Sequence, residues 1–274
     1  MKQQPKQIVS AANPLYKELL KLASASRNRS RAGQTLLDGA HLVTACLDAG
    51  RLPERVLVNA AALADAEIAA LLSRLADVEI VQLDDRLFSN LTELKSPSGI
   101  IAQIDIPGYQ LSAGLCRFAL LLEDIQDPGN LGSILRSAAA AGCDAVFLSC
   151  GCADAWSPRV LRAAMGGHFC IDIHENQDLV DVARKFPGRL YATHLKASVS
   201  LYDADLSGHL ALMIGNEGAG LSDALLAFAT DRISIPMPGR VESLNAAAAA
   251  AICLFESVRQ RAACAGKSAP EVAK

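Results

Sequence analysis

The sequence predicts an α/β protein built from two domains. Its 274 residues exceed the length of one typical domain. Hydrophobic residues make up 51% of the chain and aromatic residues only 4%, which supplies an aliphatic core. Short apolar runs alternate with segments of helical periodicity, as in folds that pack helices on sheets. Pro107 and Gly108 interrupt this alternation, so we place the boundary between the domains near residue 110.

The first domain begins with a helix. Apolar residues at helical spacing follow Pro14, and the Arg-rich stretch near residue 27 ends that helix. The remaining apolar runs are short and are separated by helical patterns, which indicates a small α/β module. Strands are predicted at residues 35–37, 55–58, 78–83 and 100–106, and helices at residues 41–49, 64–75 and 86–91.

The second domain repeats the alternation with more strongly apolar strands. Strands are predicted at residues 118–122, 145–148, 169–173, 190–194, 210–214 and 233–235. Continuous apolar strands between helices are typical of a parallel sheet covered on both faces. A long alanine-rich helix is predicted at residues 243–263, and its small side chains suit a close helix contact within the chain or with a second subunit.

Positive charge is concentrated at the start of the chain. The whole sequence carries a net charge of −3, but residues 1–31 carry +6 and the remainder −9. Such a basic arm can hold phosphates through counterion release, although a solvated helix face has the same composition. The basic side chains of the arm are Lys2, Lys6, Lys17, Lys21, Arg27, Arg29 and Arg31.

Several protein classes are disfavoured by composition. The N-terminal residues lack the apolar core of a secretory signal, and the longest apolar run, residues 246–255, is half of the roughly 20 residues that a membrane span needs. Eight cysteines in a chain of this length do not form a disulfide framework. Cys150 and Cys152 lack a second pair at zinc-ligand spacing. We therefore expect a cytoplasmic protein with no membrane partner and no metal.

Chemistry is expected in the loops after the strands of the second domain, because ligands of open α/β sheets bind at the carboxyl ends of strands. The first such segment, residues 123–136, contains an Asp-Pro-Gly turn, and Asn130 is a natural helix N-cap. Arg136 shares a helix face with Ser133 in an otherwise apolar helix. An arginine on a buried face would need an anion or a paired acid.

Two later segments have weaker signals when each is taken alone. Residues 215–220 form a glycine-rich loop between a strand and a helix, without the spacing of a dinucleotide fingerprint. Residues 235–245 end at a helix N-terminus, where Ser243 either caps the helix or helps to orient a ligand.

In order, the segments 130–136, 215–220 and 235–245 resemble the three signature motifs of the SpoU/TrmH methyltransferases of the SPOUT superfamily. Residues 157–169 are similar to the helix and turn between the first two motifs. Residues 14–106 resemble the substrate-binding domain of many such enzymes, which is akin to certain RNA-binding ribosomal proteins. That family usually has Glu at the position of Asp38 and often Gln at the position of Ser98.

The resemblance implies an RNA-binding domain at residues 1–108, a linker at 109–116, a methyltransferase domain with a deep trefoil knot at 117–266, and a tail at 267–274. It implies transfer of a methyl group from S-adenosylmethionine to a ribose 2′-hydroxyl in RNA by a homodimer. Ribosomal RNA is the favoured substrate because the N-terminal module is typical of that branch. Transfer RNA and a non-catalytic RNA-binding role are the alternatives. A nicotinamide dehydrogenase is disfavoured because no early G-x-G-x-x-G is present.

The resemblance also assigns residues. Arg136 is expected to hold a phosphate and stabilise the developing alkoxide, because arginine stays protonated and is a poor base. The expected catalytic and orienting residues are Arg136, Asn130, Glu217, Ser243 and Asn245. The expected cofactor residues are Ile214, Gly215, Asn216, Glu217, Gly218, Ile235, Pro236, Met237, Ser243 and Leu244. The expected RNA contacts are Lys17, Lys21, Arg27, Arg29, Arg31 and Arg136.

Overall fold

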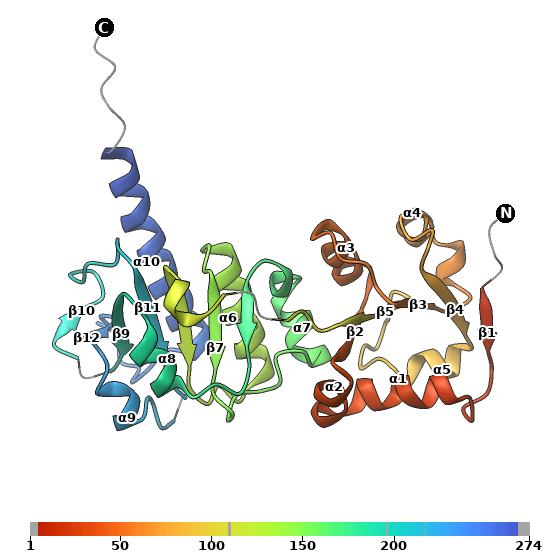
Figure 1. Ribbon diagram of the computed structural model, residues 1–274, viewed down its shortest axis with the longest axis horizontal. Coiled ribbons are helices and arrows are strands. Elements are labelled where there is room, and N and C mark those ends of the chain that lie inside the picture. The colour runs from red at the N-terminus through yellow and green to blue at the C-terminus, as the bar shows by residue number, and fades with distance from the viewer. Residues whose placement is uncertain (1–4, 109–110, 196, 217, 268–274) are drawn as a thin grey trace, which may run out of the picture. The chain divides into compact units, whose positions relative to one another are not determined.

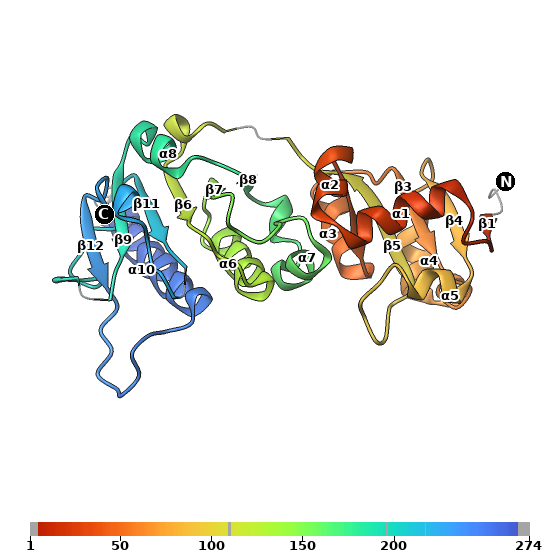
Figure 2. The same cartoon turned by 90° about the horizontal axis from the view of Figure 1, so that it is seen from below.

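The computed structural model describes residues 5–108, 111–195, 197–216 and 218–267. By its internal contacts the chain divides into two compact units. The first unit contains the residues up to 108 together with 156–169, and the second contains the rest. Both are shown in Figures 1 and 2. The domain ranges expected from the sequence assign residues 156–169 to the second domain, and these ranges stay a prediction.

The first unit is built on a mixed five-stranded sheet of order β1-β4-β3-β5-β2, in which β5 runs antiparallel to both of its neighbours. Figure 1 shows α1 and α5 on one face of this sheet and α3 and α4 on the other. Its elements are β1 (Lys6–Ile8), α1 (Pro14–Ser24), α2 (Ser26–Ala32), β2 (Gln34–Asp38), α3 (Ala40–Asp48), β3 (Arg55–Val58), α4 (Ala66–Ser73), β4 (Glu79–Leu83), α5 (Asp85–Ser89), β5 (Ile100–Asp105) and α7 (Pro158–Ala164).

Two contacts show how the core of this unit is fixed. The Asn13 carboxamide oxygen accepts from the backbone N–H of Leu15 at 2.9 Å and so caps α1. The fully buried Tyr16 then donates its hydroxyl to the carbonyl of Leu87 at 3.0 Å, which joins α1 to α5. Burying a tyrosine in this way satisfies its polar end while its ring fills the core.

Residues 156–169 pack on the first unit through polar contacts. The Thr35 hydroxyl donates to the carbonyl of Trp156 at 2.7 Å. Arg159 and Arg162 both donate to the Glu93 carboxylate, at 2.8 Å and 3.2 Å. Asp38 lies beside Arg162, with 3.8 Å between Oδ2 and Nη1. Burial raises the pKa of Asp38, whereas the hydrogen bond from Thr92 and the charge of Arg162 lower it by less.

The second unit confirms the predicted parallel sheet. Its seven strands have the order β10-β12-β9-β11-β6-β7-β8, and every pairing is parallel. In Figure 2, α8 lies on one face, and α6 and α10 lie on the other. The elements are β6 (Phe118–Leu122), α6 (Pro128–Ala140), β7 (Ala145–Leu148), β8 (Asp172–His174), α8 (Leu179–Lys185), β9 (Arg189–Thr193), β10 (Val199–Ser200), β11 (Leu210–Ile214), α9 (Asp223–Leu226), β12 (Asp231–Ser234) and α10 (Ala246–Lys267).

Several sequence predictions about individual elements were wrong. The first helix ends before the Arg-rich stretch, as predicted, but the stretch forms a second helix, α2, that was not predicted. The strand predicted from residue 169 begins at Asp172, because residues 167–169 form a 3₁₀ turn after the left-handed Met165 and Gly166. The short strands β1 and β10 were missed. Three and two residues are too few to show an alternating pattern.

Neither Asn130, the predicted cap, nor Ser243, for which capping was one of two alternatives, caps its helix. The N-cap of α6 is Asp127, whose carboxylate accepts from the backbone N–H of Asn130 at 2.7 Å. The last helix begins at Ala246 rather than at Ser243, because the Asn245 side chain accepts from the N–H groups of Ala247 and Ala248. In both helices another residue supplies the cap, and the Asn130 side chain accepts a hydrogen bond from Asn245 instead.

Among the helices within the described ranges, none is both long and apolar enough to cross a membrane.

Candidate active site

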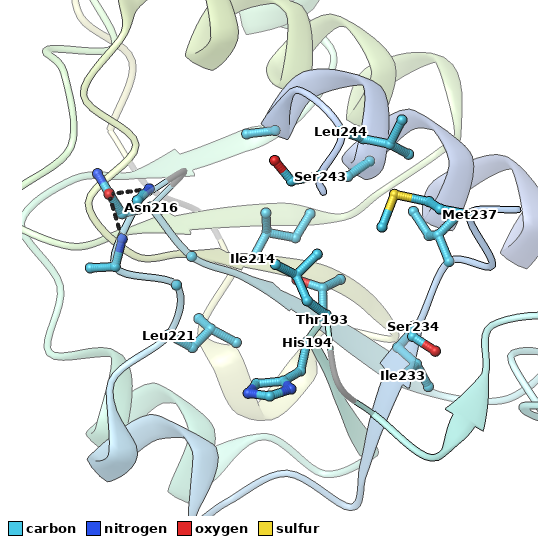
Figure 3. Close-up of a pocket in the computed structure, with 18 residues that line it drawn as sticks. Thr193, His194, Ile214, Asn216, Leu221, Ile233, Ser234, Met237, Ser243 and Leu244 are labelled. Carbon is cyan, nitrogen blue, oxygen red and sulfur yellow. Dashed lines mark hydrogen bonds between the residues drawn. The ribbon is translucent and has the colours of Figure 1, made fainter. Parts of the chain in front are cut away.

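A pocket of about 560 Å³ opens in the second unit at the carboxyl ends of β9, β11 and β12 (Figure 3). Its position follows the rule for parallel sheets, and its volume lies within the range of small-molecule sites. The lining residues are Thr193, His194, Leu195, Ile214, Gly215, Asn216, Gly218, Ala219, Gly220, Leu221, Ile233, Ser234, Ile235, Met237, Ser243, Leu244, Ala246 and Ala249.

The glycine loop after β11 forms one wall of this pocket. The N–H of Gly220 donates to the carbonyl of Asn216 at 2.9 Å and closes the loop. A Cβ at Gly215 would collide with the backbone of Gly220 and Leu221. Glycine is therefore required at position 215 for the loop to close on itself.

The segment before α10 forms the opposite wall. Figure 3 shows Ser243 and Leu244 beside the start of the helix, with Met237 nearby. Asn245 lies just outside the pocket lining and donates from Nδ2 to the Asn130 Oδ1 at 2.8 Å. The structure thus brings the first and third of the expected motif segments into direct contact.

The expectation of a buried face for Arg136 was wrong. Arg136 and Ser133 are both exposed, whereas Leu131, Ile134 and Leu135 fill the core side of α6. The apolar residues recur at helical spacing, and Arg136 falls one turn after Ser133 on the outer side. Its guanidinium is thus accessible to an external anion.

Eight of the ten residues expected at the cofactor line the pocket. Pro236 does not line it, and Glu217 lies outside the described residues. The sequence reasoning missed Thr193, His194 and Leu221. Thr193 ends the apolar strand β9 and His194 follows it, so the rule that ligands bind at the carboxyl ends of parallel strands would have found them.

The described lining is nearly uncharged. His194 is the sole titratable side chain among the described lining residues, and hydroxyl and amide groups alternate there with aliphatic walls. In the described part of the chain, no three or more His, Cys, Asp or Glu side chains are grouped to hold a metal ion. The expectation of a metal-free reaction stays a prediction.

The expected RNA contacts of the first unit differ in exposure. Lys17 and Lys21 on α1, and Arg27 and Arg31 on α2, are exposed. Arg29 is only 5% exposed and donates from Nη1 to the carbonyl of Leu22 at 2.6 Å, where it satisfies the end of α1. We therefore remove Arg29 from the surface set and keep the other four as the basic face.

An all-parallel sheet with a pocket at the carboxyl ends of its strands defines the second unit as a cofactor-binding α/β domain. Residues 117–255 match the SpoU rRNA Methylase family, and residues 13–102 match the MRM3-like substrate binding domain. The chain belongs to the SpoU rRNA methylase family.

Similar proteins cover nearly the whole chain. One is the 23S rRNA (guanosine(2553)-2'-O)-methyltransferase RlmP of Bacillus subtilis, 34% identical over 91% of this chain and 98% of the relative. Another is the mitochondrial rRNA methyltransferase 3A of Danio rerio, 33% identical over 88% of this chain and 68% of the relative. The structure of an AdoMet-bound rRNA methyltransferase from Sinorhizobium meliloti matches with a TM-score of 0.80 at 29% identity, covering 93% and 97% of the two chains.

Proposed function

We propose that this protein methylates ribose 2′-hydroxyl groups of ribosomal RNA with S-adenosylmethionine as the methyl donor. The observation that carries the proposal is the pocket between the second and third motif segments, together with the Asn245–Asn130 bond that ties the first motif segment to the third. Family membership and the named activities of the similar proteins point the same way.

The pocket residues fit this donor. Ile214, Ile235 and Leu244 offer apolar walls for an adenine ring, and the loop backbone and Ser243 offer polar groups for the ribose and the amino-acid portion. Figure 3 shows Ile214 and Leu244 on facing sides of the cavity. When bound, S-adenosylmethionine supplies the methyl group that is transferred.

The chain's own residues would place the acceptor. Arg136 is exposed and permanently cationic, so it would bind an RNA phosphate and stabilise negative charge on the 2′-oxygen as the hydroxyl loses its proton. Asn130 and Asn245 hold each other at 2.8 Å and would fix that part of the site. Ser243 lines the pocket and would orient the donor.

The basic face of α1 and α2 would hold RNA by its phosphates. Lys17 and Lys21 are four residues apart, as are Arg27 and Arg31, so each pair lies on one side of its helix. Within the described residues none of these four side chains has an acidic partner, which leaves their charge for an external anion. Such exposed positive charge can bind phosphates through counterion release.

We also propose a homodimer, a trefoil knot in the second unit and a cytoplasmic location. The dimer is supported by α10, where the exposed Ala248 and the half-exposed Phe255 follow one another at helical spacing on an outer side. The knot is supported by the family. The relative from Bacillus subtilis supports the cytoplasmic location, whereas the relative from Danio rerio is named mitochondrial.

The test is direct. The purified protein is incubated with S-adenosylmethionine carrying a labelled methyl group and with ribosomal RNA from cells that lack the protein. We expect label at a ribose 2′-oxygen, mapped by resistance of the following phosphodiester to alkaline cleavage. Label on a base, or binding of S-adenosylmethionine by calorimetry without any transfer to ribosomal RNA, would contradict the proposal.

A further inference from the structure

The side chain of Asn216 is occupied by the protein itself, although it lines the pocket. Its Oδ1 accepts from the N–H groups of Gly218 at 2.8 Å and Ala219 at 3.1 Å, which are the two dashed bonds in Figure 3. Its Nδ2 donates to the carbonyl oxygen of Asp124 at 2.9 Å. One amide thus shapes the pocket loop and joins it to the segment after β6.

Asp124 is a firmly held anchor for this link. It has a φ of 56°, a left-handed conformation that is uncommon for a residue with a side chain. Its N–H donates to the Ser149 hydroxyl at 2.9 Å, and that hydroxyl donates back to Asp124 Oδ1 at 2.6 Å. On the other side, Gly151 packs so closely that any side chain there would collide with the Asp124 carboxylate.

The segment to which Asn216 is hydrogen-bonded, beginning at Asp124, leads into α6. Asp124 stands three residues before Asp127, the N-cap of the helix that carries Asn130 and Arg136. Strained backbone persists only where the surroundings over-determine it, and here the contacts from Ser149, Gly151 and Asn216 do so. The Asp124 carbonyl is therefore a fixed point shared by the pocket loop and the start of α6.

We propose that Asn216 is a positioning residue that sets the pocket loop against the start of α6, and so sets the methyl donor against Asn130 and Arg136. This inference rests on the proposed function for its catalytic consequence. Asparagine is suited to the task because its side chain supplies both an acceptor for the loop and a donor for the anchor. Displacing a reacting group by about 1 Å can cost about a hundredfold in rate, so the link would act on the rate more than on cofactor affinity.

Three substitutions separate the acceptor function of the Asn216 side chain from its donor function. Asn216→Ser keeps a hydroxyl that can accept from Gly218 but is too short to reach Asp124. Asn216→Asp keeps the acceptor and places an oxygen against the Asp124 carbonyl. Asn216→Ala removes both functions. The serine variant is neutral and the aspartate variant is charged. If both lower kcat to a similar extent, charge alone does not explain the loss.

We expect Asn216→Ser and Asn216→Asp to lower kcat by about ten- to hundredfold, because the loop and the start of α6 would shift relative to each other, with cofactor affinity changed by less than about threefold. Asn216→Ala should lower both kcat and cofactor affinity. In hydrogen exchange, Gly218 and Ala219 should stay protected in the serine variant and lose protection in the alanine variant. Ser222→Ala is the matched control, because it removes another hydrogen bond between the same segments, from Ser222 Oγ to Glu123 Oε1 at 2.7 Å, while the Ser222 N–H still donates to Glu123 Oε2. Its kcat should stay within about threefold of wild type.

The inference is overturned if kcat is unchanged in the serine and aspartate variants, if cofactor affinity falls in parallel with kcat in both, or if Ser222→Ala lowers kcat equally. These results are distinct from failure of the proposed function. If the wild-type protein transfers no methyl group to ribosomal RNA, the function fails, while hydrogen exchange and cofactor binding still decide whether Asn216 shapes the loop.

Discussion

The two units use the carboxyl ends of their strands in opposite ways. In the first unit, the reversed strand β5 brings its preceding loop to the edge where β2 and β3 end. There Gly39 donates to the carbonyl of Ile100 at 3.0 Å, Asn59 donates to the carbonyl of Gly99 at 3.1 Å, and Ala40 donates to the Ser98 hydroxyl at 3.3 Å. The loop fills the edge and satisfies its backbone groups.

In the second unit every strand is parallel, so no returning strand closes that edge, and the pocket occupies it. A single reversed strand is therefore enough to turn a ligand-binding edge into a packed one. The first unit is left with the outer sides of its helices for binding, where the exposed charges of α1 and α2 lie. A small cofactor needs a concave cradle, whereas the phosphates of a polymer need accessible positive charge.

The largest effect is expected in the second unit, from Arg136→Ala. Because Arg136 is exposed on α6 and outside the pocket lining, its loss should lower methyl transfer by about 10²–10³-fold and leave S-adenosylmethionine affinity unchanged. Single-turnover rates and calorimetry measure the two quantities. Ser133→Ala, one turn earlier on the same exposed side, is the matched control. Parallel loss of rate and cofactor affinity in Arg136→Ala would show that α6 belongs to the cofactor site.

A smaller effect is expected from the first unit. Replacing Lys17, Lys21, Arg27 and Arg31 by glutamine should weaken RNA binding and flatten the plot of log affinity against log salt by about 0.7–0.9 per lost phosphate contact. Cofactor affinity should not change, since the pocket lies wholly in the second unit.

The matched control for the basic face replaces four exposed basic residues elsewhere in the same unit. Lys6, Arg51, Arg74 and Arg86 give an equal change in net charge outside α1 and α2. Their replacement should flatten the plot of log affinity against log salt by less than replacement of the basic face does. An equal reduction in both variants would mean that the unit binds RNA through its overall charge and not through a defined face.

The smallest effect is expected on the pH dependence of stability, and it comes from Asp38 at the packed edge of the first unit. Burial raises the pKa of Asp38 above its ordinary value, so the folded state holds a proton that the unfolded state has released. Stability should therefore fall as the pH rises from the ordinary aspartate pKa of about 3.9 through the raised one. Asp38→Asn should remove this contribution to the pH dependence of the free energy of unfolding, as measured by urea denaturation at a series of pH values. If the stability of the variant falls more with rising pH than that of the wild type, pairing with Arg162 outweighs burial.

Most of the sheet strands could be predicted because continuous apolar runs carry a strong local signal. The strands at 55–58, 118–122, 145–148 and 210–214 were predicted to the residue. Caps and short strands could not be predicted in this way. Asp127 and Asn130 are both good cap residues. The predicted Asp-Pro-Gly turn was wrong, because α6 begins at Pro128 and Asp127 therefore takes the cap position.

The same division applies to the candidate site. The motif segments were visible because glycine, asparagine and arginine stand out among apolar neighbours. Exposure was not visible: Arg29 and Arg31 are two residues apart with identical chemistry, yet Arg29 is buried against α1 and Arg31 is exposed. The Asn216–Asp124 contact joins residues that are 92 positions apart, which no local pattern records.

The sequence by itself determined the parallel sheet of the second unit, the order of its motif segments and the concentration of charge near the N-terminus, because each depends on residue type and spacing along the chain. The tertiary structure alone decided which edge stays open, which arginine is exposed and which distant groups the Asn216 side chain binds. Those outcomes depend on which distant groups meet, and the direction of one strand or the angle between two helices changes them without changing any local pattern.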